Sequence, residues 1–113
     1  MAVAQAAVNV FQTITATVGL TTSVVYVAPV GYTGVTLLTQ VTNTGSTTEE
    51  ISFGFRRLGN DSPIVQNLAL PANDTVNLLS GKLVLESGDS LTLVGTDATN
   101  LKFLASILET SNI

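Results

Sequence analysis

Apolar and polar residues alternate along the N-terminal part of the chain, and this alternation predicts a strand. From Val8 to Val18 the even positions are largely apolar, whereas the odd positions are polar except for Phe11. A period of two is typical of a strand that buries one face in a core and leaves the other face outside. We therefore expect a first strand over residues 8–18, with Phe11 as the apolar residue on its polar face.

Turn residues divide the rest of the chain into short alternating segments. The segment over residues 49–58 alternates most clearly, because Ile51, Phe53 and Phe55 share one face. Clusters of glycine, proline, asparagine and aspartate separate the segments at intervals of about eight to twelve residues, as in a sandwich. The predicted strands cover residues 8–18, 24–27, 32–42, 49–58, 64–70, 75–79, 83–85, 91–94 and 101–109.

This order of elements predicts an all-β fold, an antiparallel β-sandwich or jelly-roll-like domain of eight to nine short strands. The 113 residues suffice for one domain over residues 8–113, preceded by a predicted N-terminal arm over residues 1–7. The N-terminal segment lacks a basic region and a sustained apolar run, so we expect it to be unprocessed. No window approaches about 18 consecutive apolar residues, so we expect no membrane-spanning segment and no membrane partner.

The surface of this domain is expected to be short of charge. Charged residues make up 11% of the chain against 45% hydrophobic residues, and the first charged residue is Glu49. Soluble proteins usually carry about a quarter charged residues, so we predict that other subunits cover part of the uncharged surface. Threonine leaves an alternative open, because Thr-rich sheet faces tolerate water. We expect a homo-oligomer, with a trimer favoured, and an arm that adds as an edge strand to a neighbour's sheet.

Charge balance and missing residue types argue against several classes of function. The net charge is −4 and the four cations are scattered, so we expect no nucleic-acid partner. The chain has no cysteine and no histidine, and therefore no thiolate or imidazole metal ligands. Asp61, Asp74 and Asp97 each have an asparagine nearby but lack the spacing of a calcium loop, and turn capping explains them more simply. We predict no metal and no cofactor.

The stretch from Gly88 to Leu91 spells Gly-Asp-Ser-Leu, the signature of a lipase and esterase class in which the serine is the nucleophile. A serine hydroxyl needs a base to remove its proton, and the chain has no histidine for this role. The alternative is a turn between two short strands, and we favour it. We therefore predict no catalytic residues and no enzyme activity.

Several residues are candidates for contacts with partners. Arg56 and Arg57 are neighbours that point to opposite faces of a strand, so both an intersubunit salt bridge and a pairing within the chain remain open. Tyr26 and Tyr32 bracket a Pro-Gly turn, which is the one place for an aromatic sugar platform. The candidate interface residues are Val3, Val8, Val10, Phe11, Tyr26, Tyr32, Arg56 and Arg57.

Two parts of the chain resemble a pattern common in small structural proteins of tailed bacteriophages. The first is YVAPVGYTGV at residues 26–35, followed by VTNT at 41–44, where a Tyr-x-Ala-Pro-x-Gly turn leads into a strand. The second comprises LPANDT at 70–75, LESGDSL at 85–91 and a final strand that ends in ILE at 107–109. Together they span most of the chain from Val24 onward.

The resemblance implies a virion β-sandwich without catalytic residues. Its implied role is that of a capsid decoration (cement) protein, which stabilises the shell by bridging neighbouring capsid subunits. The implied partners are further copies of the chain and the major capsid protein or other virion structural proteins. The implied localisation is the virion, assembled in the host cytoplasm. The alternatives are a neck, tail or fibre-attachment protein and a receptor- or glycan-binding knob.

Overall fold

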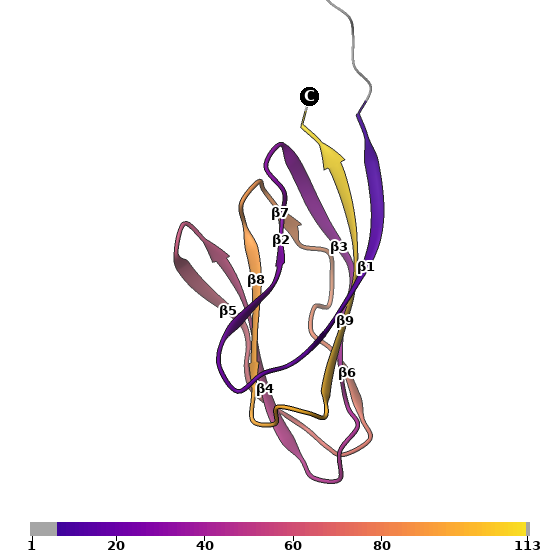
Figure 1. Cartoon of the computed structure of the whole chain (residues 1–113), viewed down its shortest axis with the longest axis vertical. Coiled ribbons are helices and arrows are strands. Elements are labelled where there is room, and N and C mark those ends of the chain that lie inside the picture. Colours follow the sequence, from indigo (N-terminus) through magenta and orange to yellow (C-terminus); the bar gives the residue numbers. More distant parts are fainter. Residues whose placement is uncertain (1–6, 113) are drawn as a thin grey trace, which may run out of the picture.

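Two antiparallel sheets pack face to face (Figure 1). A computed structural model describes residues 7–112, and within this range it has strands and no helix. Sheet A has the strand order β1-β9-β3-β6, with β7 also paired to β3, and sheet B has the order β2-β8-β4-β5. The strands are β1 (Asn9–Thr17), β2 (Ser23–Val27), β3 (Tyr32–Asn43), β4 (Glu49–Arg57), β5 (Asn60–Leu70), β6 (Thr75–Asn77), β7 (Val84–Leu85), β8 (Ser90–Gly95) and β9 (Leu101–Ser111).

The connections between the strands make this sandwich a jelly roll. The chain changes sheet after β1, β2, β3, β5, β7 and β8, and β4 and β5 form a hairpin within sheet B. Strands that are distant in sequence therefore become neighbours, and β1 lies antiparallel beside β9 along its whole length. The prediction of an antiparallel, jelly-roll-like sandwich of eight to nine strands is confirmed.

The core lies between the sheets and is built from the inward-facing side chains of both. Phe53 of β4 and Phe103 of β9 meet at its centre, with ring centroids 6.1 Å apart. Ile51 is buried on the same face as Phe53, as the alternation predicts, whereas Phe55 is only half-buried. The other buried apolar residues are Val18, Tyr26, Ala28, Val41, Leu70, Leu78, Leu85, Leu91, Leu93, Leu101, Ala105 and Ile107.

The hairpin between β4 and β5 differs from the sequence prediction. The sequence predicts a loop over residues 59–63, and this prediction is wrong, because a two-residue turn of Leu58 and Gly59 joins the strands directly. Both turn residues have a positive φ, 52° at Leu58 and 79° at Gly59, as a tight type I′ hairpin turn requires. Pro63 lies within β5, which tolerates a residue without an N–H because it is an edge strand.

Two further expectations concern the termini and the membrane. The predicted arm over residues 1–7 lies outside the described residues except for Ala7, and so does the candidate Val3. From residue 7 to residue 112 there is no helix long and apolar enough to cross a membrane.

Candidate functional site

Charged residues are distributed unevenly between the two sheets. Among the described strands of sheet A, the charged residues are Lys102 and Glu109, and Glu109 is buried. The strands of sheet B carry Glu49, Glu50, Arg56, Arg57 and Asp61. The outer face of sheet A is therefore the large strand surface with the least charge.

A row of apolar side chains crosses this outer face. Phe11 of β1 lies opposite Leu108 of β9, which lies opposite Val35 of β3, which lies opposite Val84 of β7. Directly opposed residues share a face. The inward-pointing sequence neighbours of Leu108, Val35 and Val84 are buried, apart from Leu83, which is half-buried. Phe11 is 71% exposed and Val84 is 54% exposed. We call these four residues the apolar strip.

The strip lies in a surface of uncharged side chains. Leu38 of β3 and Leu104 of β9 occupy the next two rows of the same face, and Leu38 is exposed. Threonines of β1 flank them, with Thr13 opposite Ser106 and Thr15 opposite Leu104. Exposed apolar residues that are contiguous in this way mark contact surfaces more often than singly scattered ones do.

Within residues 7–112, strand β1 forms one edge of sheet A and bonds to β9 on one side only. Val8 O accepts a hydrogen bond from Ser111 N at 3.0 Å, and Val18 N donates to Leu101 O at 2.9 Å. Since backbone groups of an antiparallel strand point alternately to its two sides, the even residues of β1 face β9. The N–H and C=O groups of the odd residues, from Asn9 to Thr17, therefore point away from the sheet.

The candidate residues of the first strand lie at this free edge. Val8 is 52% exposed and Val10 is 39% exposed, on the side of β1 that faces sheet B. Phe11 lies on the outer face, within the apolar strip. Their exposure is compatible with the predicted contact, and the contact itself stays a prediction.

Tyr26 is a core residue, and the prediction that it lies on an interface or on a sugar platform is wrong. Its side chain is 7% exposed and crosses from β2 to β9, where Tyr26 Oη donates a hydrogen bond to Glu109 Oε2 at 2.5 Å. Gly34 leaves room for it, because a Cβ at this position would lie 2.9 Å from Tyr26 Oη. Burial raises the pKa of Tyr26, and the hydrogen bond to Glu109 raises it further. Tyr32 is half-buried and has no tyrosine beside it on the surface.

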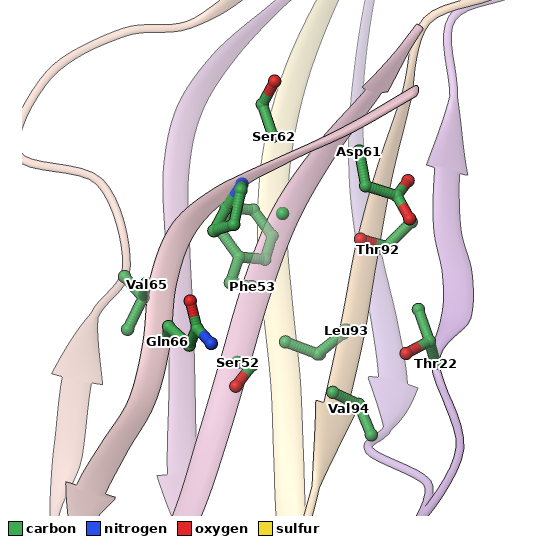
Figure 2. Close-up of a pocket in the computed structure, with 12 residues that line it drawn as sticks. Thr22, Ser52, Phe53, Asp61, Ser62, Val65, Gln66, Thr92, Leu93 and Val94 are labelled. Atoms are coloured by element: carbon green, nitrogen blue, oxygen red, sulfur yellow. The ribbon is translucent and has the colours of Figure 1, made fainter. Parts of the chain in front are cut away.

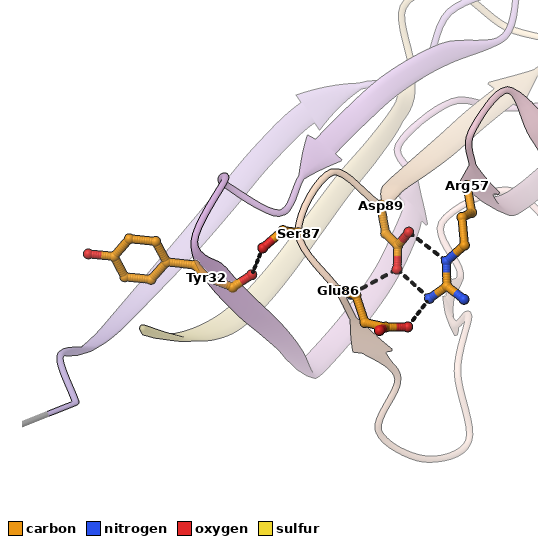
Figure 3. Close-up of polar contacts among 5 residues, drawn as sticks. All are labelled: Tyr32, Arg57, Glu86, Ser87 and Asp89. Carbon is orange, nitrogen blue, oxygen red and sulfur yellow. Dashed lines mark hydrogen bonds and ion pairs between the residues drawn. The ribbon is translucent and has the colours of Figure 1, made fainter. Parts of the chain in front are cut away.

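The arginine pair is engaged within the chain. Arg56 Nε donates to Asp61 Oδ1 at 2.5 Å. Arg57 donates to both carboxylate oxygens of Asp89, at 2.8 and 2.7 Å, and to Glu86 Oε2 at 2.5 Å (Figure 3). Of the two alternatives left open by the sequence, the pairing within the chain is the one present. Both arginines lie on β4 of sheet B, whereas Val10 and Phe11 lie on β1 of sheet A, so the described candidate residues do not form one surface.

The Gly-Asp-Ser-Leu segment forms a turn held by its aspartate. Asp89 is 3% exposed and also accepts a hydrogen bond from Glu86 N at 2.8 Å, while Gly88 has a φ of 86°. Ser90 is 6% exposed at the start of β8. Ser87 Oγ donates to Tyr32 O at 2.9 Å and so connects this turn to the start of β3 (Figure 3). These contacts hold the segment as a turn between β7 and β8 and support its interpretation as a turn.

A small hollow lies on the outer face of sheet B (Figure 2). The polar residues Thr22, Ser52, Asp61 and Gln66 line it together with apolar residues that include Pro63, Val65 and Val94. Its volume is about 190 Å³, and small-molecule sites usually measure about 300–1,000 Å³. Among residues 7–112, no three side chains of His, Cys, Asp or Glu lie close enough together to hold a metal ion.

The burial of the Asp89 and Glu109 carboxylates was not predicted from the sequence. Glu109 continues the inward alternation of Leu101, Phe103, Ala105 and Ile107, and this parity was a usable signal for its burial. Asp89 gave no comparable signal. Its arginine partner lies 32 positions earlier in the chain and meets it only through the pairing of β4 with β8.

We expect Tyr26→Phe to lower the free energy of unfolding by about 1–3 kcal/mol, because the buried Glu109 carboxylate loses its donor. Glu109→Gln keeps an acceptor for Tyr26 and should cost less. Urea unfolding of both single variants and the double variant measures the coupling. Equal and additive losses would contradict the hydrogen bond.

We expect the Asp89→Asn variant to lose less stability on acidification than the wild type does. The hydrogen bonds from Arg57 hold the pKa of Asp89 below its usual range, despite the opposing effect of burial. A carboxyl with a lowered pKa in the folded state contributes stability that is complete above about pH 4 and disappears as the pH falls further. Thermal unfolding between acid and neutral pH measures this difference. Asp61→Asn, in a more exposed ion pair, is the control with a smaller expected change, and an equal effect of the two would refute the assignment.

Comparison with known proteins gives a structural likeness and no family. No protein-family model and no curated protein matches the chain. A solved chain from a structure described as "Bacillus endospore appendages form a novel family of disulfide-linked pili" aligns with a TM-score of 0.59 and 11% sequence identity. The alignment covers 95% of this chain and 88% of the other. At this identity the likeness shows that the chain shares a β-rich fold with a protein of that structure.

Proposed function

We propose that this protein is a non-enzymatic structural subunit that is bound into a larger protein assembly through the β1 side of sheet A. The observation that carries the proposal is the apolar strip of Phe11, Leu108, Val35 and Val84, which is continuous across four strands and partly open to solvent. A structural subunit needs a surface of this kind, because it has to be covered in the assembled state.

The energetics of the strip support association. Covering a large apolar side chain such as Phe11 contributes about 1.5–3 kcal/mol, and the neighbouring rows add to this. Placing a charge in a buried contact is costly, and of the outward-facing residues in the paired rows of β1, β9 and β3 only Lys102 is charged. The contact is therefore expected to be apolar and only weakly dependent on salt.

The assembly that the sequence resemblance favours is the virion of a tailed bacteriophage. In this proposal the subunit acts as a capsid decoration protein, with the major capsid protein and further copies of the chain as its partners. The resemblance of residues 26–35, 41–44, 70–75, 85–91 and 107–109 supports the choice of assembly. The low charge of the outer face of sheet A supports the mode of attachment. A place in the neck, tail or fibre attachment uses the same surface.

A surface appendage is the second candidate, favoured by the structural likeness to a pilus protein. That protein is described as belonging to disulfide-linked pili. The present chain has no cysteine, so a filament of its copies would be held by non-covalent contacts alone. A glycan-binding knob would require Tyr26 and Tyr32 to form a surface together, and Tyr26 is buried in the core.

Phe11→Asp should weaken self-association or attachment to the particle by at least about tenfold, because it places a charge at the β1 end of the apolar strip. Leu58→Asp makes the same change at a residue that is 94% exposed on the β4–β5 turn, and it should behave as the wild type. Sedimentation velocity over a range of concentrations and co-sedimentation with capsids lacking the subunit measure both effects.

Two results would overturn this proposal. One is a wild-type chain that stays monomeric at every concentration and binds no particle. The other is a Phe11→Asp variant that is folded by circular dichroism and assembles as well as Leu58→Asp.

A further inference from the structure

We propose that β1 pairs with β1 of a second copy, antiparallel about a two-fold axis at Thr13, so that two A sheets become one continuous sheet. The inference rests on the proposed function, because it names the contact by which copies of the subunit join.

Three of the four sheet edges are unsuited to accepting a strand. In sheet B, β2 is a strand of five residues with a register shift between Val24 and Tyr26. The other edge, β5, contains Pro63 and the charged Asp61, and its pairing with β4 shifts register twice. The far edge of sheet A is divided between β6, with three residues, and β7, with two. Such features are the devices by which proteins block their sheet edges.

Strand β1 has none of these protective features. Its nine residues, NVFQTITAT, include no proline, no glycine and no charged side chain, and its pairing with β9 runs without a register shift. The backbone groups of Asn9, Phe11, Thr13, Thr15 and Thr17 point outward, as the hydrogen bonds at both ends of the strand establish. A long, regular and uncharged edge is a strand-pairing site unless something covers it.

The length of β1 selects the register of the pair. Antiparallel pairing centred on Thr13 places Asn9 opposite Thr17 of the second copy and Phe11 opposite Thr15 of the second copy. All outward groups of both strands are then used, in about ten hydrogen bonds. A shift by two positions in either direction leaves outward groups at both ends without partners.

The side chains are compatible with a copy of the same strand. Phe11 would pack against Thr15 of the second copy, an aromatic and β-branched pair of the kind that stabilises neighbouring strands. No charges of like sign become neighbours, because β1 carries none. The apolar strip of one copy would continue toward the threonines of the other, which enlarges the uncharged face of the joined sheet.

This contact has a consequence for the number of copies. When β1 pairs with β1 of a second copy about a two-fold axis, the edges of both strands are occupied. The contact therefore makes a closed dimer. The dimer would replace the trimer expected from the sequence as the unit of assembly. Pairing of β1 with β2 or β5 of another copy would instead produce an open chain of subunits, but those edges are blocked as described.

Single cysteines test the register, and the chain has no cysteine of its own to interfere. Thr13→Cys would face itself across the axis with Cα atoms about 5.5 Å apart, within reach of a disulfide. Thr15→Cys is the matched control on the same face, because its two copies would lie about 14 Å apart along the joined strands. With oxidised glutathione, the Thr13→Cys dimer should form at least about tenfold faster than the Thr15→Cys dimer.

A charge at the same position gives a second readout that requires no disulfide. Thr13→Lys places two like charges opposite each other and should weaken dimerisation by at least about tenfold in sedimentation equilibrium. Thr48→Lys, on an exposed loop residue, is the control and should leave it unchanged.

The outcomes separate this inference from the proposed function. Equal crosslinking of both cysteine variants, or a Thr13→Lys variant that associates like wild type, overturns the β1 pairing. If the wild type still assembles in that case, the proposed function stands. A wild-type chain that neither associates nor binds particles overturns both.

Discussion

The architecture depends on strand β9, which is paired along its length with β1 on one side and with β3 on the other. Its inward side chains from Leu101 to Ile107 are buried in the core, and Glu109 extends this row to the hydrogen bond with Tyr26. Because β9 is the last of the described strands in chain order, sheet A is complete only once residues up to Ser111 have joined it. Because β9 pairs with only one side of β1, the backbone N–H and C=O groups on the other side of β1 remain without partners among the described strands.

The charged residues and ion pairs are also divided unevenly between the two sheets. The ion pairs lie on or beside sheet B, where Arg57 fastens the Glu86–Asp89 turn and Arg56 spans the β4–β5 hairpin. These contacts use up the arginines within the chain. In the described strands of sheet A the outer face carries one charge, that of Lys102, and its exposed rows consist of leucine, valine and threonine. The difference between the two sheets is the physical reason to place the assembly contact on sheet A.

Much of the fold could be read from period-two alternation and turn residues. The segment with Ile51 and Phe53 became a core strand as expected, and the Pro-Gly and Gly-Asp turns became turns between strands. The β4–β5 hairpin was missed because Leu58 has a positive φ, which a leucine rarely adopts and which no sequence rule anticipates. Only part of the candidate surface could be predicted from the sequence. Phe11 stood out as an exception to the alternation, but the cross-strand partners Leu108, Val35 and Val84 depend on register between distant strands. Tyr26 was misplaced for the same reason, because its partner Glu109 lies 83 positions away.

We propose that the β1 side of sheet A bears the contact between subunits. The most direct measurement is residue-resolved amide hydrogen exchange of the full chain, dilute and then concentrated or bound to particles. We expect the outward amides of Phe11, Thr13 and Thr15 to exchange quickly in the dilute chain and to become protected by at least about tenfold on assembly. Amides that face β9, such as that of Gln12, should be protected in both states. Assembly that protects β2 or β5 while these outward amides continue to exchange quickly would exclude a subunit contact on the β1 side of sheet A.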